Sequence, residues 1–200
     1  NHLTVDASYY NIDWTDIQLQ QRDPETEFVY FTNAGKATSN GLDVMITGAN
    51  DNGLVVVGTL SFADSTLDDS LGVGLYGLPG DRLPFTSEFN GTLSMDKDFT
   101  IGGIYDAFVG VTWARVGSRY STFSPSAAVE RILLSSYNTV DLRLGARNQD
   151  GWTLTLFAKN LTDERGLLGS SHELGAGTSG RYNLTLIRPR AIGLSLAKDF

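Results

Sequence analysis

The sequence predicts an all-β protein whose antiparallel strands follow one another up and down in a meander. Apolar residues alternate with polar or small residues in almost every segment, which is the periodicity of a strand with two different faces. The chain contains 22 glycines and only 19% of its residues are charged, a composition that favours a β-rich architecture. Helical periodicity is not sustained anywhere over about ten residues.

About nine strands are expected. The first places Leu3, Val5 and Ala7 on one face, and the last alternates from Ile192 to the terminal Phe200. All five prolines fall in connections or at strand starts, where a missing N–H group is tolerated. The expected strands cover residues 3–9, 16–22, 42–47, 54–62, 85–95, 106–114, 140–145, 152–159 and 192–200.

The connections between these strands differ in length. Counting back from the C-terminus in strict up-and-down order places the short turns at one end of the sheet. This asymmetry is typical of an outer-membrane barrel, which has tight turns on one side and long loops on the other. Short connections are expected near 13–15, 49–53 and 148–151, a somewhat longer one near 96–103, and long ones at 65–83, 120–136 and 162–187, with 22–27 as an exception.

The polar face carries charged residues in the middle of strands. In a β-sandwich these side chains would meet solvent, and in a wide barrel they would meet a wet lumen, so alternation alone leaves both open. The apolar rows run for nearly ten residues, roughly the length of a tilted span of the bilayer, which favours the barrel. The residues expected to face a lumen are Asp6, Asp43, Glu88, Asp106, Asp141, Arg143 and Lys159.

Aromatic residues near predicted strand ends support the same interpretation. Tyrosine and tryptophan favour the water–lipid interface, although aromatic residues are also common in sheets generally. The candidates for such girdles are Tyr9, Trp14, Tyr105, Trp113, Tyr120, Tyr137 and Trp152.

The composition also excludes several functions. A net charge of −8 without a Lys/Arg cluster argues against nucleic acid as a partner, and the absence of cysteine excludes disulfide scaffolds and thiolate metal sites. The only histidines, His2 and His172, have no metal-ligand spacing, and Ser170-Ser171-His172 lacks the context of a catalytic triad. We therefore expect no enzymatic activity, no cofactor and no metal. Asn1 leads into the first strand pattern without a signal peptide, so we expect either a removed leader or a start inside a larger protein.

Four segments resemble TonB-dependent outer-membrane receptors. "FTNAGKATSNGLDVMI" (31–46) resembles a family strand with asparagine-x-glycine followed by glycine-hydrophobic-acid-hydrophobic, and "LPFTSEFNGTLSMDKDF" (83–99) is similar to a strand that follows an external loop. Residues 137–166, with "KNLTDE", resemble the penultimate hairpin, and "RPRAIGLSLAKDF" (188–200) resembles the closing strand. The matches come in family order over 3–200; Lys198 departs from the aromatic residue usual at its position.

The resemblance implies a 22-stranded transmembrane β-barrel in the outer membrane of a Gram-negative bacterium, with an N-terminal plug and a TonB box. Residues 1–200 would then be the C-terminal part of the barrel, without the plug domain and the box. The implied partners are outer-membrane lipid, the TonB–ExbB–ExbD energy-transducing complex, a small-molecule or glycan ligand, and the barrel-assembly machinery. This machinery would read Phe200 as a terminal signal.

In such a barrel, ligand contacts would come from loop tips and the upper lumen. Arginines suit anionic groups because the guanidinium fork binds carboxylates in a bidentate manner, and tyrosines suit stacking on rings. The candidates are Tyr76, Arg82, Arg119, Tyr120, Phe123, Arg131, His172, Arg181 and Tyr182.

Three functional hypotheses follow. The first is the barrel part of an active importer of a scarce ligand, such as a ferric siderophore, cobalamin or a glycan. The second is a passive outer-membrane channel without a plug. The third is a soluble β-sandwich that binds carbohydrate, which would stay monomeric without detergent.

Overall fold

The computed structural model describes residues 1–22, 28–33, 35–71, 77–123, 131–173 and 181–199. No helix among these residues has the length and apolar character needed to cross a membrane. The main sheet has eight strands: β1 (His2–Thr15), β4 (Lys36–Ala49), β5 (Leu54–Leu67), β6 (Phe89–Ile101), β7 (Tyr105–Val116), β10 (Tyr137–Arg147), β11 (Trp152–Lys159) and β14 (Ala191–Lys198). Three separate hairpins pair β2 (Gln18–Arg22) with β3 (Val29–Asn33), β8 (Arg119–Tyr120) with β9 (Leu133–Leu134), and β12 (Leu167–Glu173) with β13 (Arg181–Leu186).

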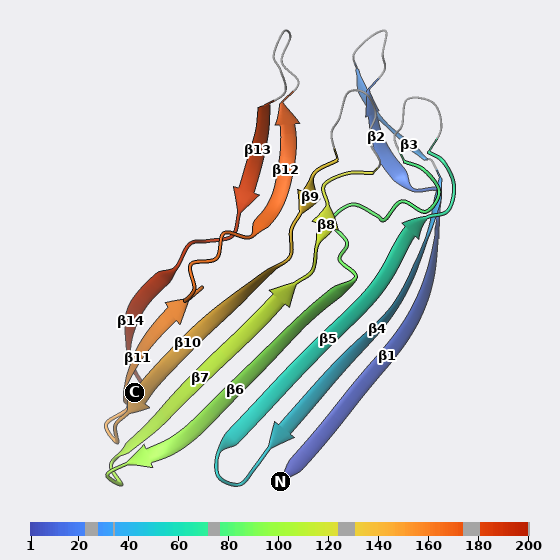
Figure 1. Ribbon diagram of the computed structural model, residues 1–200. Coiled ribbons are helices and arrows are strands. Elements are labelled where there is room, and N and C mark those ends of the chain that lie inside the picture. Colours follow the sequence, from blue (N-terminus) through green and yellow to red (C-terminus); the bar gives the residue numbers. More distant parts are fainter. Residues whose placement is uncertain (23–27, 34, 72–76, 124–130, 174–180, 200) are drawn as a thin grey trace.

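The main sheet is the predicted up-and-down meander. Each of its strands pairs antiparallel with the next main strand in the chain, in the order β1-β4-β5-β6-β7-β10-β11-β14. The short turns lie at one end, which we call the short-turn end, together with both termini (Figure 1). The connections at the opposite end, the long-connection end, contain all three hairpins. The connections at this end are 16–35, 68–88, 117–136 and 160–190.

The main sheet contains eight strands, close to the predicted number of about nine. Segment 16–22 contributes β2 to a separate hairpin, and the predicted turn at 13–15 is part of β1. The reason is that β1 keeps its pairing with β4 to the end, with Asp13 opposite Thr38 and Thr15 opposite Lys36. Residues 22–27, predicted as a connection that broke the pattern, then fall inside the long connection 16–35. All short turns therefore lie at one end of the sheet, and all long connections lie at the other.

The strand predicted at 85–95 begins later and ends later than expected. Phe85 has a φ of 60°, a left-handed conformation that a strand cannot contain. It follows Pro84 in a turn, and β6 starts only at Phe89. The predicted connection at 96–103 shrinks accordingly to the residues between Ile101 and Tyr105.

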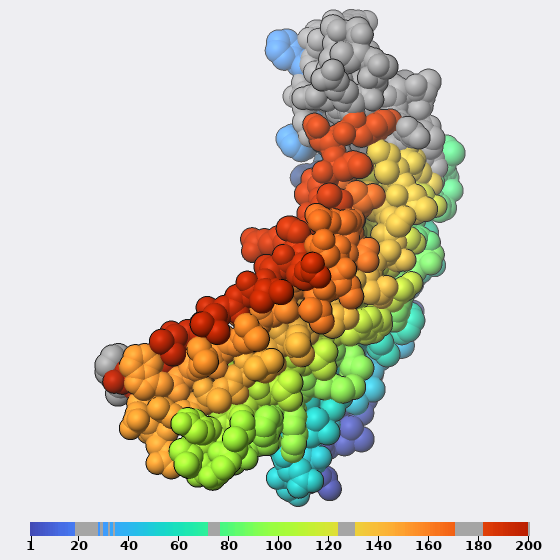
Figure 2. All heavy atoms as spheres, turned by 60° about the vertical axis from the view of Figure 1, so that its left-hand side comes forward, coloured from blue at the N-terminus to red at the C-terminus, as the bar shows by residue number. Residues whose placement is uncertain are grey.

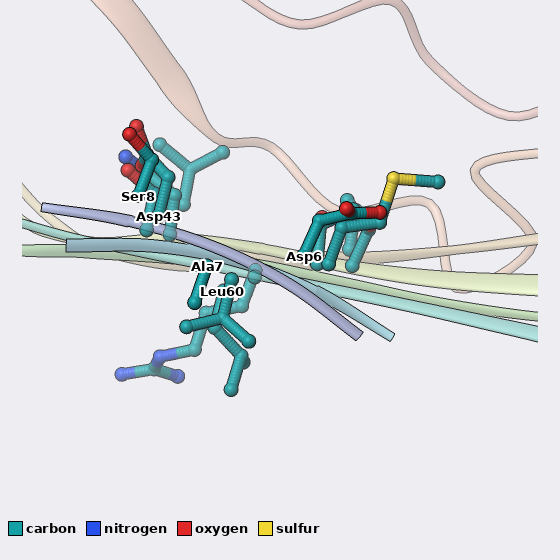
Figure 3. A pocket seen from close by; sticks show the side chains of 15 residues that line it. Asp6, Ala7, Ser8, Asp43 and Leu60 are labelled. Carbon is teal, nitrogen blue, oxygen red and sulfur yellow. The ribbon is translucent and has the colours of Figure 1, made fainter. Parts of the chain in front are cut away.

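The two faces of the sheet differ in chemistry. Residues opposite each other in the register share a face, so Asp6 lies with Met45 and Ser8 lies with Asp43 on one face, whereas Ala7 lies with Val44 on the other. In Figure 3, Asp6, Ser8 and Asp43 project from one side, and Ala7 and Leu60 from the other. The pale red C-terminal part of the ribbon rises on the side of Asp6, so this polar face is the concave one.

The convex, apolar face is not covered by a second layer of the described chain. Figure 2 shows a curved shell with β14, in red, along its near edge. Leu3 is 73% exposed and Ile192 is 68% exposed, although both belong to the predicted apolar rows. A soluble sandwich would bury such rows against another sheet, and the described residues form a single curved layer, as expected for part of a barrel wall.

The predicted girdle residues divide between the two faces of the sheet. Tyr9, Tyr105, Trp113 and Trp152 occupy apolar-face positions of the register. The other three predicted girdle residues differ: Trp14 and Tyr137 occupy polar-face positions, and Tyr120 belongs to the hairpin strand β8. Lys198, the departure from the family pattern, lies opposite Trp152 with its Nζ atom 5.0 Å from the ring centroid. The electrostatic attraction between the ammonium group and the ring face stabilises this cross-strand pair.

Glycines on the polar face make room for large side chains on neighbouring strands. In each case the aromatic ring lies over the glycine directly opposite, because a Cβ atom there would come within 2.1–2.5 Å of the ring. Such ring-over-glycine pairs cover exposed backbone and fix the register of adjacent strands. The pairs are Tyr10 with Gly41, Phe108 with Gly145, and Phe157 with Gly193.

Gly145→Val is expected to destabilise the sheet by about 1–3 kcal/mol, the usual cost of overpacking. Its new Cβ atom would lie 2.5 Å from Phe108 Cζ and 2.6 Å from the backbone oxygen of Leu154, which cannot rotate away. Gly48→Val is the matched control, because nothing lies within 4 Å of a Cβ atom at that position. The measurement is urea unfolding from detergent or bilayers. Equal stability of the two variants would contradict the proposed steric role.

The small buried core lies at the long-connection end. Ala37 and Leu67 are opposite each other on the polar face, and both are almost fully buried. Ile17, Leu71 and Phe123 from three different connections pack against them, with Leu83 beside the cluster. The connections therefore fold back over the concave face at this end, which places their other side chains near the opening.

Candidate functional site

Four of the predicted ligand-contacting residues meet at the long-connection end. Arg119 and Tyr120 form β8, which continues upward from β7 (Figure 1). Arg131 comes from the same connection, 117–136, and Arg82 comes from the connection 68–88. Both Arg82 and Arg131 have their guanidinium carbon within 6.0 Å of the Tyr120 ring centroid. The structure therefore groups two of the predicted arginines around the predicted tyrosine, although the sequence had suggested these residues only one by one.

Arg131 is the most tightly held of these cations. Its guanidinium carbon lies 3.7 Å from the Tyr120 ring centroid, and its Nη1 atom lies 3.5 Å from Asp81 Oδ1. The Asp81 carboxylate is buried and also accepts a hydrogen bond from the backbone N–H of Leu78. An arginine fixed on an aromatic face by a buried carboxylate is a rigid part of the site.

Arg82 is the more exchangeable cation. It forms an ion pair with Glu88, whose side chain is 65% exposed. Because this carboxylate is solvated, an ion pair with it costs little to open. An anionic ligand can replace Glu88 at Arg82 more readily than it can replace the buried Asp81 at Arg131.

Arg119 connects two hairpins. It donates a hydrogen bond from Nη2 to the backbone oxygen of Leu167, at the start of β12, over a distance of 2.7 Å. Its guanidinium carbon lies 5.8 Å from the ring of Tyr137, which is buried beneath Gly166. Within the described part of the chain, the buried Nε atom of Arg119 has no hydrogen-bond partner. Arg119 thus positions the β12–β13 hairpin relative to β8.

The remaining predicted contacts have different outcomes. Phe123 is only 8% exposed within the apolar core, so it serves packing and is removed from the ligand set. His172 lies opposite Tyr182 in the β12–β13 register, whereas Arg181, the residue before Tyr182, lies opposite Glu173 and therefore belongs to the other face of the hairpin. Tyr76 and Phe200 lie outside the described residues.

The residues predicted to face a lumen share the concave face. Asp43, Asp106, Asp141, Arg143 and Lys159 occupy its strand positions, and Glu88 immediately precedes β6.

Two cross-strand ion pairs organise this face. Lys159 Nζ lies 2.8 Å from Asp141 Oδ2 on the adjacent strand. Arg143 Nη2 lies 2.7 Å from Asp96 Oδ1, reaching past β7 over Gly110. A side chain at Gly110 would block this reach, since its Cβ atom would lie 2.1 Å from Asp96 Oδ1.

The residues that line the hollow of Figure 3 do not form one enclosed site. Asp6, Ser8 and Asp43 lie on one side of the sheet, whereas Ala7 and Leu60 lie on the other. The sheet backbone separates the two groups, so no single ligand touches both. Among the described residues, no group of three or more His, Asp or Glu side chains is placed to hold a metal ion.

The most organised polar centre outside the arginine cluster is Asn160, which the sequence analysis did not single out. Its side-chain Nδ2 donates to the backbone oxygens of Glu164 and Arg188 at 2.9 and 3.0 Å, and its Oδ1 accepts from the backbone N–H of Glu164 at 2.9 Å. It therefore ties both ends of the 160–190 connection together. The asparagine in "KNLTDE" could have indicated this role, because asparagine adopts a left-handed backbone more readily than most residues. Asn160 has such a backbone, with a φ of 49°.

Asp163 reinforces this closure. Its Oδ1 accepts a hydrogen bond from the backbone N–H of Arg190 at 2.9 Å, and its Oδ2 lies 3.0 Å from Arg165 Nη2. The hydrogen bond from Arg190 is the main reason that the pKa of Asp163 is lowered, and Arg165 lowers it further. Asp163 lies beyond the end of β11, in the long connection.

Asp163→Asn is expected to reduce the pH dependence of unfolding at acidic pH. A carboxyl with a lowered folded-state pKa stabilises the fold above its ordinary pKa of 3.8, and that contribution is lost as the pH falls through the folded-state value. The variant should be less stable than the parent at pH 7 and closer to it at pH 3, measured by denaturant unfolding. Asp69→Asn, at an exposed position of another long connection, is the control. The same pH profile for parent and Asp163→Asn would contradict the role.

Comparison with known proteins supports the fold. A family model described as "TonB dependent receptor-like, beta-barrel" matches residues 1–161. None of the curated proteins compared with the sequence matches it.

Several solved structures share the arrangement of strands. The ferric yersiniabactin uptake receptor FyuA from Yersinia pestis has 21% sequence identity and a TM-score of 0.79, with coverage of 99% of this chain and 28% of that chain. The ferric-catecholate import receptor Fiu from E. coli K12 has 20% identity and a TM-score of 0.67, covering 97% and 24%. The siderophore receptor PiuA from Acinetobacter baumannii has 17% identity and a TM-score of 0.67, covering 98% and 26%. The present chain thus spans about a quarter of the length of these proteins.

Proposed function

Because the chain belongs to the TonB-dependent receptor β-barrel family, we propose that it forms the C-terminal part of an outer-membrane receptor that actively imports a scarce ligand. Ferric siderophores, cobalamin and glycans are the ligand classes considered. Such a receptor has no enzymatic activity, because its work is binding and passage. The plug domain and the TonB box would belong to the parent protein outside residues 1–200.

The observation that carries this proposal is the two-sided sheet with all long connections at one end. The convex face is apolar and uncovered, which suits acyl chains, and the concave face carries charges, which suit a hydrated lumen. In the described chain, β1 and β14 are edges that are not paired with each other. Further strands of the parent barrel would pair with these edges, since unpaired edges are not tolerated in lipid.

The proposed partners follow from this placement. Lipid would contact the convex face, and the TonB–ExbB–ExbD complex would act through the N-terminal part of the parent protein. The barrel-assembly machinery would recognise the C-terminal strand ending in Phe200.

The proposed ligand contacts are Arg82, Arg119, Tyr120, Arg131, His172, Arg181 and Tyr182, with Tyr76 from the adjacent connection. Within the described residues, the Arg82–Glu88 pair is the part most able to open for a ligand. We propose that an anionic group of the ligand takes the place of the Glu88 carboxylate at Arg82. The guanidinium then gains a charge-assisted hydrogen bond with the ligand in exchange for an exposed ion pair.

Binding to the full-length receptor tests this contact. A ferric carboxylate siderophore and a ferric catecholate siderophore serve as probes, with tryptophan fluorescence or calorimetry as the measurement. Arg82→Gln should weaken binding of the recognised probe about tenfold or more, and Glu88→Gln should strengthen it, because it frees Arg82. Arg147→Gln, the same charge change at the short-turn end, is the control. If Arg82→Gln binds as tightly as the control, Arg82 is not a ligand contact.

An uptake experiment distinguishes active import from a passive channel, because only active import depends on energy coupling. Uptake of the recognised probe by cells should fall to background when tonB is deleted from the host. Uptake that persists in the deletion strain would instead support a passive channel.

A further inference from the structure

Arginines gather on the outer side of the sheet where the apolar face ends. Arg115 is the first, near the top of β7. In the register it lies opposite Gly91 and Asn138, on the face that also carries Trp113 and Val140. Its Nη1 atom lies 3.4 Å from Asn138 Oδ1. Arg115 therefore belongs to the convex face and does not point into the concave side with the proposed ligand contacts.

Three more arginines surround the closure of the 160–190 connection. Arg188 and Arg190 flank Pro189 directly before β14, and both residues are exposed. Arg190 lies two residues before Ile192, which occupies an apolar-face position. Arg165 is fixed close by, because Asp163 contacts both its guanidinium and the backbone N–H of Arg190.

Contacts in the structure link these positions. The N–H of Leu161 donates to the backbone oxygen of Val140, two residues from Asn138, the partner of Arg115. The same Leu161 accepts a hydrogen bond from Arg190 Nη1 at 3.4 Å. We call Arg115, Arg165, Arg188 and Arg190 the outer arginine cluster.

The cluster keeps an excess of positive charge. Asp163 neutralises Arg165, as the 3.0 Å ion pair shows. Among the described residues, the Arg188 guanidinium forms no hydrogen bond or ion pair, and Arg115 contacts only a neutral oxygen. Arg190 donates to a neutral backbone oxygen, and its charge also acts on the nearby Asp163 carboxylate. Arg115 and Arg188 thus stand without a carboxylate partner in that part of the chain, and Arg165 and Arg190 share the single carboxylate of Asp163.

An anion at this place would complete the cluster. Arginine is costly in the middle of a lipid-facing surface, but the cost falls close to zero at the interface, where the side chain reaches the phosphates of the headgroups. The guanidinium fork matches two phosphate oxygens, and Asn138 adds a neutral polar neighbour. The imported ligand is a poor candidate, because it is proposed to bind on the concave side.

We infer that the outer arginine cluster binds the phosphate groups of a lipid in the membrane leaflet at the long-connection end. The acyl chains of that lipid would lie on the convex face beside residues such as Trp113 and Val140. This inference rests on the proposed placement of the convex face in lipid, and on no feature of the ligand site.

Native mass spectrometry of the full-length receptor in detergent tests the inference. The probes are diphosphoryl lipid A, the same lipid without phosphates, and inorganic phosphate as a competitor. The variant Arg188→Gln/Arg190→Gln should bind the diphosphoryl lipid about 25-fold more weakly, about fivefold for each arginine removed. Arg188→Lys/Arg190→Lys should retain most of the binding, which controls for folding. Lys97→Gln, a charge removal on the same face near the short-turn end, should change it little.

Three results would overturn the inference. Unchanged lipid binding by the double glutamine variant would remove the arginines from the site. Equal binding of the lipid without phosphates would leave only apolar contact, and full competition by millimolar inorganic phosphate would indicate a site for the free anion. Siderophore binding by the same variants is measured in parallel. Loss of lipid binding with normal siderophore binding supports the lipid site, whatever the identity of the imported ligand. The lipid measurement also stays interpretable if the proposed import function is wrong.

Discussion

Val111→Arg is expected to make folding into a bilayer less favourable by about 2–4 kcal/mol. This is the cost of placing a cation near the middle of the lipid-facing surface of a barrel. Val111 lies opposite Met95 and Leu142, in the middle of β6, β7 and β10 on the apolar face. Its side chain is 38% exposed, with no described segment above it. The arginine would have to bury its guanidinium among acyl chains or bend far along the strand to reach the headgroups.

The adjacent Thr112→Arg is the matched control. Thr112 lies on the concave face opposite Asp141 and Ser94, so a new guanidinium there meets a carboxylate and, in the proposed barrel, water. We expect a change within about 0.5 kcal/mol. The measurement is equilibrium folding of the full-length receptor into bilayers, followed in urea. If the two variants lose the same stability, the assignment of the convex face to lipid is wrong.

Asn160→Ala is expected to destabilise the protein by about 3–4 kcal/mol. The substitution removes three side-chain hydrogen bonds, each contributing about 1 kcal/mol, and leaves the backbone groups of Glu164 and Arg188 without those partners. Asn160 is only 6% exposed, so water does not easily replace the lost contacts. Alanine also adopts the left-handed backbone at a cost of about 1 kcal/mol.

Asn160→Gly separates these two effects. Glycine accepts the φ of 49° without strain but makes none of the hydrogen bonds, so it should recover only about 1 kcal/mol of the loss. Thermal unfolding and limited proteolysis within 165–187 give the two readouts. A glycine variant as stable as the parent would show that backbone conformation, and not the side chain, holds the connection closed.

Most of the fold could be predicted because period-two alternation is a local property of the sequence. Each side of a strand such as 106–114 shows its own chemistry, and the register later places Val111 and Thr112 on opposite faces as that pattern requires. The error at 13–15 has the opposite origin. "DWT" contains turn-forming residues, but its conformation is decided by pairing with residues about 25 positions away in β4, which no local signal reveals.

The candidate site was less accessible to sequence reasoning. Residue chemistry suggested Arg82, Tyr120 and Arg131 one by one, and the fold brings them together. Residue chemistry alone could not distinguish a ligand contact from a core residue at Phe123. This residue is part of the apolar core, and its burial depends on how the connections fold back. Asp81 was missed as a partner of Arg131 for the same reason.

The closure at Asn160 has a consequence for how this protein family can change. Since the ends of the 160–190 connection are fastened to each other at their base, the residues between them carry little responsibility for holding β11 and β14 in place. The β12–β13 hairpin within this connection can therefore be replaced without disturbing the main sheet. If the proposed receptor function holds, natural variation or transplantation of this segment would alter ligand recognition while the sheet beneath it stays intact.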